Sequence, residues 1–83
     1  MHKVLVEIML PAADKTFDVY IPLESRIDEV LKLLKGMMAD LSDGKFQAAD
    51  DDILCDGITG EMLDINKTVA DLGIKNGKKL MLI

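Results

Sequence analysis

Only one stretch of this 83-residue sequence has the apolar spacing of a long helix, and this limits the folds that the chain can adopt. Between about residues 25 and 43, apolar side chains recur every three or four residues and form one stripe. The stripe consists of Ile27, Val30, Leu31, Leu34, Met38 and Leu41. One helix cannot bury its own apolar stripe, so another layer must cover it. The sequence therefore predicts an α+β fold, a sheet packed on one helix, in a single domain spanning residues 1–83.

The ends of this helix carry recognisable signals. The hydroxyl of Ser25 can accept a hydrogen bond from a first-turn amide, and Asp28 and Glu29 favour the positive end of the helix dipole. We therefore expect the helix to begin at Ser25. Asp43-Gly44 is expected to end it, and residues 45–52 are expected to form a polar, acidic connector.

Strand-like segments lie on both sides of the helix. Lys3–Leu10 alternates between one apolar face and one mixed face, residues 16–21 do the same, and Pro11 begins the turn between them. This pattern predicts a hairpin. After the helix we expect a short strand at residues 53–55, a brief one at 62–63 and a final strand at 79–83.

The charge is unevenly distributed along the chain. The net charge is −5, but residues 40–64 hold eight acidic residues and only one base, Lys45. Residues 65–83 hold four lysines against Asp71. An acidic chain with a strongly acidic middle repels phosphate backbones and anionic lipid heads, so nucleic acid is not an expected partner.

The sequence lacks the residue sets of known catalytic, metal or cofactor sites. One His2 and one Cys55 cannot supply the four ligands of a structural zinc site. The acidic loops around Gly44 and Gly57 place apolar residues where a calcium loop needs ligands, and residues 57–60 lack the glycine spacing and lysine of a phosphate loop. We therefore expect no enzyme activity, no metal and no cofactor.

The chain is not expected to insert into a membrane. Its longest uninterrupted apolar stretch covers residues 8–13, whereas a membrane span needs about 20 residues. No signal peptide is recognisable. A lone Cys55, expected to be a buried and inert thiol, fits a reducing compartment, and we expect a cytoplasmic protein.

The stretch Thr68-Val-Ala-Asp71-Leu-Gly73-Ile-Lys-Asn76-Gly77 resembles a signature of ubiquitin-like domains of the β-grasp fold. Thr68 and Asp71 have the spacing of a capping box that begins one helical turn, and the glycines lead to a closing strand. The resemblance covers essentially the whole chain. Within that superfamily the sequence is similar to the small YukD/EsaB-type proteins of bacterial type VII secretion systems, in size and in the tail from Asn76 to Ile83. The resemblance implies a non-catalytic adaptor or regulatory protein that binds a protein partner, such as a membrane-bound secretion component.

Two other interpretations remain open. Ubiquitin-like modifiers and sulfur carriers end in Gly-Gly, whereas this sequence stops at Leu82-Ile83, so we do not expect a carrier unless the gene continues past Ile83. A β-grasp module of an unrelated complex is the other alternative.

Binding is predicted on the outer face of the sheet. If Leu80 and Leu82 point toward the helix, the first and last strands of a β-grasp sheet place large apolar side chains on the opposite face, which is polar in many sheets. A contiguous exposed apolar patch marks an interaction site, and Met adapts to irregular surfaces. A homo-oligomer contact on this face is a further possibility. The predicted partner-binding residues are Leu5, Met9, Tyr20, Leu54, Met81 and Ile83.

Overall fold

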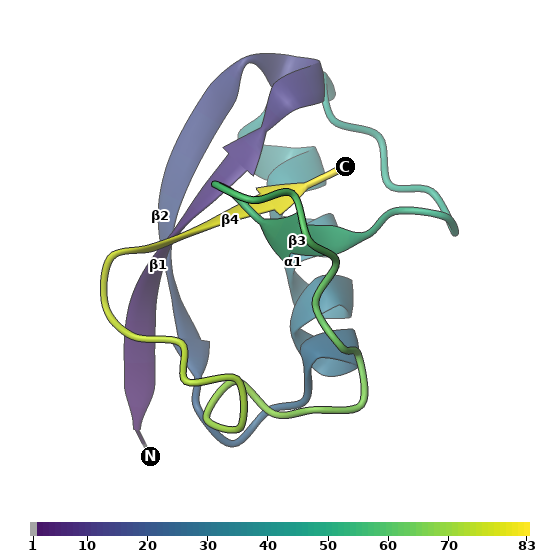
Figure 1. Ribbon diagram of the computed structural model, residues 1–83. Helices are drawn as coiled ribbons and strands as arrows, with labels where there is room; N and C mark the ends of the chain where they lie inside the picture. Colours follow the sequence, from purple (N-terminus) through teal and green to yellow (C-terminus); the bar gives the residue numbers. More distant parts are fainter. Residues whose placement is uncertain (1) are drawn as a thin grey trace.

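A computed structural model describes residues 2–83 and shows a four-stranded mixed sheet with one helix across one face (Figure 1). The strands lie in the order β2-β1-β4-β3, with β1 parallel to β4 and antiparallel to β2, and β3 antiparallel to β4. The elements are β1 (Lys3–Leu10), a 3-10 turn η1 (Pro11–Ala13), β2 (Lys15–Pro22), α1 (Ile27–Leu41), β3 (Leu54–Asp56) and β4 (Lys78–Leu82). The predicted α+β, β-grasp order is confirmed.

The hairpin forms as the alternation predicts. Strand β1 buries every second side chain, from Val4 to Leu10, and Val6 pairs with Val19 of β2 across the ladder. Asp14 closes the turn in the left-handed region, with φ of 52°, and its amide donates to the Pro11 carbonyl. The predicted first strand is correct, and the second is one residue longer at each end.

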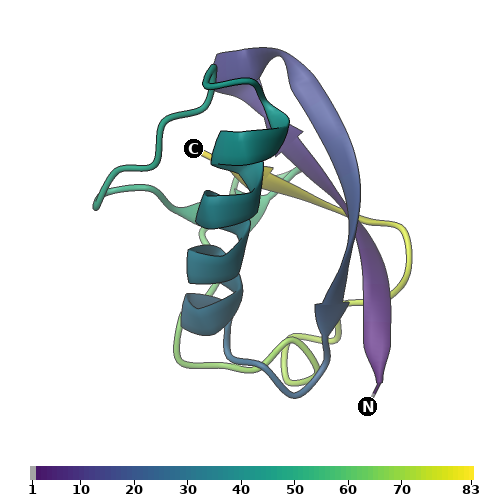
Figure 2. The same cartoon turned by 180° about the vertical axis from the view of Figure 1, so that it is seen from behind.

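Helix α1 begins two residues later than predicted, and Ser25 does not cap it. The side chain of Glu29 accepts a hydrogen bond from the Arg26 amide at 3.0 Å instead. Two further amides of the first turn donate to carbonyls of a distant loop, Ile27 to Lys67 at 2.9 Å and Asp28 to Ile65 at 3.2 Å. These bonds satisfy amide groups that have no partner inside the helix, so the 65–68 loop fixes the helix start (Figure 2).

The end of α1 differs from the prediction in what it buries. Leu41, predicted as part of the core stripe, is 49% exposed. Phe46, inside the predicted polar connector, is buried instead, and its amide donates to the buried Ser42 hydroxyl at 2.9 Å. The chain turns back at Asp43 and Gly44, both with positive φ, and this reversal carries Phe46 into the core in place of Leu41.

The long loop before β4 contains the predicted capping pair. The Asp71 amide donates to Thr68 Oγ1 at 3.0 Å, and the Thr68 amide donates to Asp71 Oδ2 at 3.1 Å. This turn buries Val69 under the sheet, where its amide bonds the Ser25 carbonyl. The predicted strand at residues 62–63 is a single bridge between Met62 and Cys55.

The core lies between the helix and the inner face of the sheet. Its buried side chains come from every strand, from α1 and from both long connections. They are Val4, Val6, Ile8, Leu10, Ala13, Val19, Ile21, Ile27, Val30, Leu34, Met38, Phe46, Leu54, Val69, Ile74, Leu80 and Leu82. Within residues 2–83, no helix covers the opposite face of the sheet, which holds the candidate site (Figures 1 and 2).

Candidate protein-interaction surface

The outer face of the sheet carries three methionines in one line across the strands. The register pairs Met9 of β1 with Met81 of β4, Met81 with Cys55 of β3, and Cys55 with Met62 of the following loop. Directly paired residues share a face of the sheet and lie close enough for their side chains to touch. We call Met9, Met81, Cys55 and Met62 the methionine row.

A pair of isoleucines extends the methionine row toward the end of β4. The Ile53 amide donates to the Ile83 carbonyl at 2.7 Å, and the Ile83 amide donates to the Ile53 carbonyl at 3.0 Å. Ile83 is 47% exposed and Met62 is 62% exposed, while Met9 and Met81 are half-buried. The row and this pair together present flexible sulfur-containing and aliphatic side chains to solvent.

Charged residues divide the predicted patch into two parts. Glu7 of β1 pairs with Asp18 of β2 on one side and with Lys79 of β4 on the other. Leu5 and the exposed Tyr20 form a separate pair beyond this charged row. The expectation of one contiguous apolar patch is therefore wrong, because Glu7 lies between Leu5 and Met9 on the outer face of β1 and its ladder partners are charged.

Leu54 was predicted on the outer face, and the structure places it in the core. It is 2% exposed and pairs with Leu82, which points inward. Cys55 occupies the outer position on β3 instead. Met62 and Ile53 were not among the predicted site residues. Met62 comes into place through a single bridge to β3, and one bridged residue leaves no period in the sequence.

The thiol of Cys55 is fully buried within the methionine row. Its Sγ donates a hydrogen bond to the Met81 carbonyl at 3.5 Å. Burial, and secondarily the neighbouring charge of Asp56, raises the pKa of the thiol, which disfavours the nucleophilic thiolate. Within residues 2–83, no group of three or more His, Cys, Asp or Glu side chains is placed to hold a metal ion.

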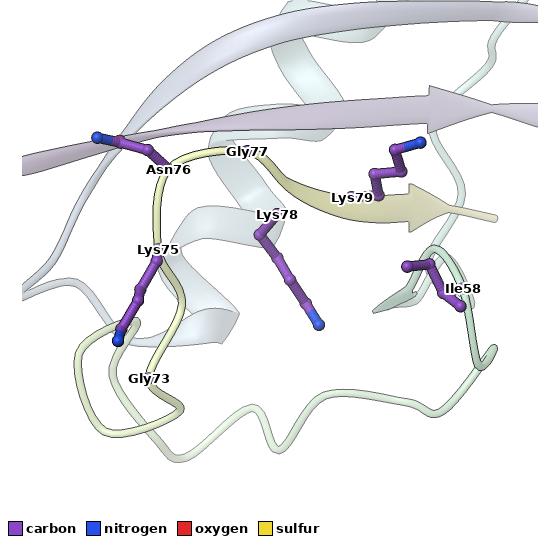
Figure 3. Close-up of a pocket in the computed structure, with 7 residues that line it drawn as sticks. All are labelled: Ile58, Gly73, Lys75, Asn76, Gly77, Lys78 and Lys79. Atoms are coloured by element: carbon purple, nitrogen blue, oxygen red, sulfur yellow. The ribbon is translucent and has the colours of Figure 1, made fainter.

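The loop after β3 is held against β4 by Asp56. One carboxylate oxygen of Asp56 pairs with the Lys78 ammonium, and the other accepts hydrogen bonds from the amides of Ile58 at 2.7 Å and Thr59 at 3.0 Å. The bond to Lys78, followed by these amide bonds, lowers the pKa of Asp56 well below its ordinary value of 3.8. Beside this loop lies a pocket of about 340 Å³ bordered by Ile58, Lys75, Lys78 and Lys79 (Figure 3).

The described part of the chain contains no helix long and apolar enough to cross a membrane.

Comparison with models of known families, and with curated protein sequences, finds no match. Solved structures do match over the whole length. The chain is similar to the EccD5 ubiquitin-like domain from Mycobacterium xenopi, with a TM-score of 0.74, 21% identity, and coverage of 100% of this chain and 94% of that one.

Two further structures show the same likeness. The ubiquitin-like domain of the Mycobacterium tuberculosis type VII secretion system protein ECCD1 aligns with a TM-score of 0.68 and 16% identity, covering 100% of this chain and 99% of that one. The ubiquitin of Caldiarchaeum subterraneum aligns with a TM-score of 0.75 and 18% identity, covering 99% and 92%. The chain therefore has the ubiquitin-like β-grasp fold.

Proposed function

We propose that this chain is a non-catalytic, cytoplasmic adaptor or regulatory protein of a bacterial type VII secretion system, and that it binds a protein partner through the methionine row. The observation that carries the proposal is the partly exposed methionine row, in which Met62 is exposed and Met9 and Met81 are half-buried, on a fold similar to the ubiquitin-like domains of EccD5 and ECCD1.

The chemistry of the outer face favours protein binding over a solvated surface. A sheet with one free face commonly presents polar side chains there, but this face presents Met9, Met81, Met62 and Ile83. Methionine side chains have several rotatable bonds and a polarizable sulfur, so they can adapt to an irregular partner surface. Burying such side chains against a partner is favourable by roughly 25 cal/mol per Å² of apolar surface.

The charged row beside the apolar side chains can orient the partner on this surface. Glu7 and Lys79 are neighbours of opposite charge on adjacent strands. A partner with a complementary pair of charges would be steered into one register, and a reversed pair would be rejected. Leu5 and Tyr20 lie beyond this charged row, and we place them at the edge of the contact.

The test is affinity capture from lysate and solubilised membranes of the native host. The bait pair is wild type and a Met62→Asp/Ile83→Asp variant, chosen because both sites are exposed and neither belongs to the core. Leu33→Asp is the matched control, because Leu33 is 49% exposed on α1, on the other side of the sheet. Circular dichroism verifies that all three baits are folded.

Secretion components captured by wild type and by Leu33→Asp, but lost with the double variant, would support both the role and the site. Equal capture by all three baits would overturn the site. Capture of no secretion component by wild type would overturn the adaptor role and leave the fold alone.

A further inference from the structure

Two exposed groups of opposite charge lie at different places on this protein, and we call them the acidic end and the basic end. The acidic end follows α1 and consists of Asp40, Asp43, Asp50, Asp51 and Asp52, with Lys45 as its one base. All of these acids are exposed except Asp52, which is half-buried. In Figure 1 this segment is the teal loop at the upper right of the molecule.

The basic end is the turn before β4, drawn in yellow-green at the left of Figure 1, and its Lys75, Lys78 and Lys79 border the pocket of Figure 3. Lys78 is neutralised by Asp56. None of the ion pairs among residues 2–83 involves Lys75 or Lys79. Glu7 is the acidic neighbour of Lys79 across the ladder. Lys75 and Lys79 therefore carry the positive charge beside this pocket, from opposite borders and with their side chains pointing away from each other, and Glu7 partly offsets the charge of Lys79 (Figure 3).

Each end also presents one exposed aliphatic side chain. Ile58 borders the basic pocket, and its side chain is 79% exposed. Its backbone amide donates a hydrogen bond to the Asp56 carboxylate. Leu41 is 49% exposed and lies between Asp40 and Asp43 in the sequence of the acidic end. Covering such exposed aliphatic side chains with a partner removes apolar surface from water, which is favourable.

We propose that the basic pocket binds the acidic segment 40–52 of a second copy of this chain, so that copies associate head to tail. Opposite charges meet in this contact, and Ile58 can cover Leu41 of the neighbouring copy. The two surfaces lie on different sides of the molecule, so the contact is heterologous. It leaves a free acidic end and a free basic end after each addition, which generates open chains unless the rotation closes a ring.

A contact that depends on exposed charge pairs is expected to be weak and sensitive to salt. Exposed charge pairs contribute little individually and are screened at physiological salt. The overall charge of −5 opposes any contact that pairs like surfaces. We therefore expect association only at high protein concentration in low salt, and its loss at high salt.

Sedimentation velocity of the purified chain over a concentration series, in about 20 mM and about 500 mM NaCl, tests the proposal because the Debye length changes several-fold between them. Two variants each reverse the charge of one end: Lys75→Glu/Lys79→Glu changes the basic end, and Asp50→Lys/Asp51→Lys changes the acidic end. Lys32→Glu/Lys35→Glu on α1 makes the same charge change as the first variant at another site. Circular dichroism verifies the fold of every variant.

The expected result is association of wild type and of the α1 control in low salt only, with each end variant remaining monomeric alone. The two end variants mixed together should associate again in low salt, because the intact acidic segment of one meets the intact basic pocket of the other and the two reversed ends are also of opposite charge. A wild type that stays monomeric throughout, or that associates equally after both end changes, would overturn the proposal. The measurement uses no secretion component, so its outcome is independent of the adaptor role.

Discussion

The side chain of Asn76 accepts a hydrogen bond from the backbone amide of Leu5 at 2.8 Å, across 71 positions of sequence. The next residue, Gly77, donates its amide to the Leu5 carbonyl, also at 2.8 Å, and adopts a φ of 89° that favours glycine. The Asn-Gly pair thus bonds both polar groups of one β1 residue. It aligns β4 with β1 immediately before their ladder begins, and so sets the register of the methionine row.

Replacing Asn76 by Ala removes one of these two bonds. We expect the free energy of unfolding to fall by about 1 kcal/mol, the usual net contribution of one hydrogen bond. Urea denaturation followed by circular dichroism measures the change. Asn76→Asp keeps an acceptor oxygen and should lose less, and Asn66→Ala, at an exposed asparagine of the same loop, should be close to neutral. Equal losses for Asn76→Ala and Asn66→Ala would contradict the assigned bond.

Two glycines should respond to alanine in opposite directions. A Cβ on Gly57 would lie 2.9 Å from both the carbonyl carbon and oxygen of Lys79, backbone atoms that cannot move without disturbing β4. We expect Gly57→Ala to destabilise the fold by about 1–3 kcal/mol. A Cβ on Gly36 in α1 meets nothing within 4 Å, so Gly36→Ala should stabilise by up to about 1 kcal/mol through helix propensity.

Thermal unfolding of both glycine variants under one condition checks the pair. A stable Gly57→Ala protein would show that the loop after β3 can move away from Lys79. Wild type should lie between the two variants, because the same added methyl group meets Lys79 backbone atoms at Gly57 but only raises helix propensity at Gly36.

Long, regular patterns in the sequence predicted the fold, and short elements were predicted poorly. Strand β1 has eight residues of clear alternation, and its bounds and inward face are correct. Strand β3 has only three residues, too few for a period, so Leu54 was assigned to the wrong face. The start of α1 was misplaced because its amides bond the Lys67 and Ile65 carbonyls, which are distant in the sequence.

The candidate site was also predicted only in part, because its members come from both long strands and short elements. Alternation put Met9 on the outer face, and Met81 followed from the premise that Leu80 and Leu82 point toward the helix, but only the register reveals that Glu7 and Lys79 lie side by side and divide the patch. Met62 enters through one bridge to Cys55. Tertiary pairing of this kind has no local signal, because it depends on how two distant segments align.

The stability of the fold should depend on pH through Asp56. Its pKa in the folded state lies below the ordinary 3.8, so the folded protein holds this carboxylate ionised under conditions where the unfolded chain protonates it. The stabilisation is complete above about pH 5 and is lost as the pH falls through the folded pKa. Wild type should therefore lose stability steadily between about pH 4 and pH 2.

The Asp56→Asn variant isolates this carboxylate. Its unfolding free energy should depend less steeply on pH than that of wild type. The difference in slope should correspond to the uptake of at most about one proton on unfolding. Some slope should remain, because hydrogen bonds from Thr68 also lower the pKa of Asp71. Urea denaturation at several pH values measures both curves. Parallel curves for wild type and variant would show that the bonds of Asp56 to Lys78 and to the loop amides do not persist in solution.

Phe46 and Leu41 can be compared directly. The sequence pattern places Leu41 in the core and Phe46 in a polar connector, and the structure shows the reverse. Phe46 is 4% exposed and packs in the core, so Phe46→Ala leaves a cavity and should cost about 3–5 kcal/mol. Leu41 is 49% exposed, so Leu41→Ala should cost less than about 1 kcal/mol. Equilibrium denaturation with urea measures both, and Phe46→Leu should fall between them because it refills part of the cavity. If Leu41→Ala were the more damaging substitution, the chain would not turn back at Asp43 and Gly44 as described, and the connector that carries Phe46 into the core would have a different path.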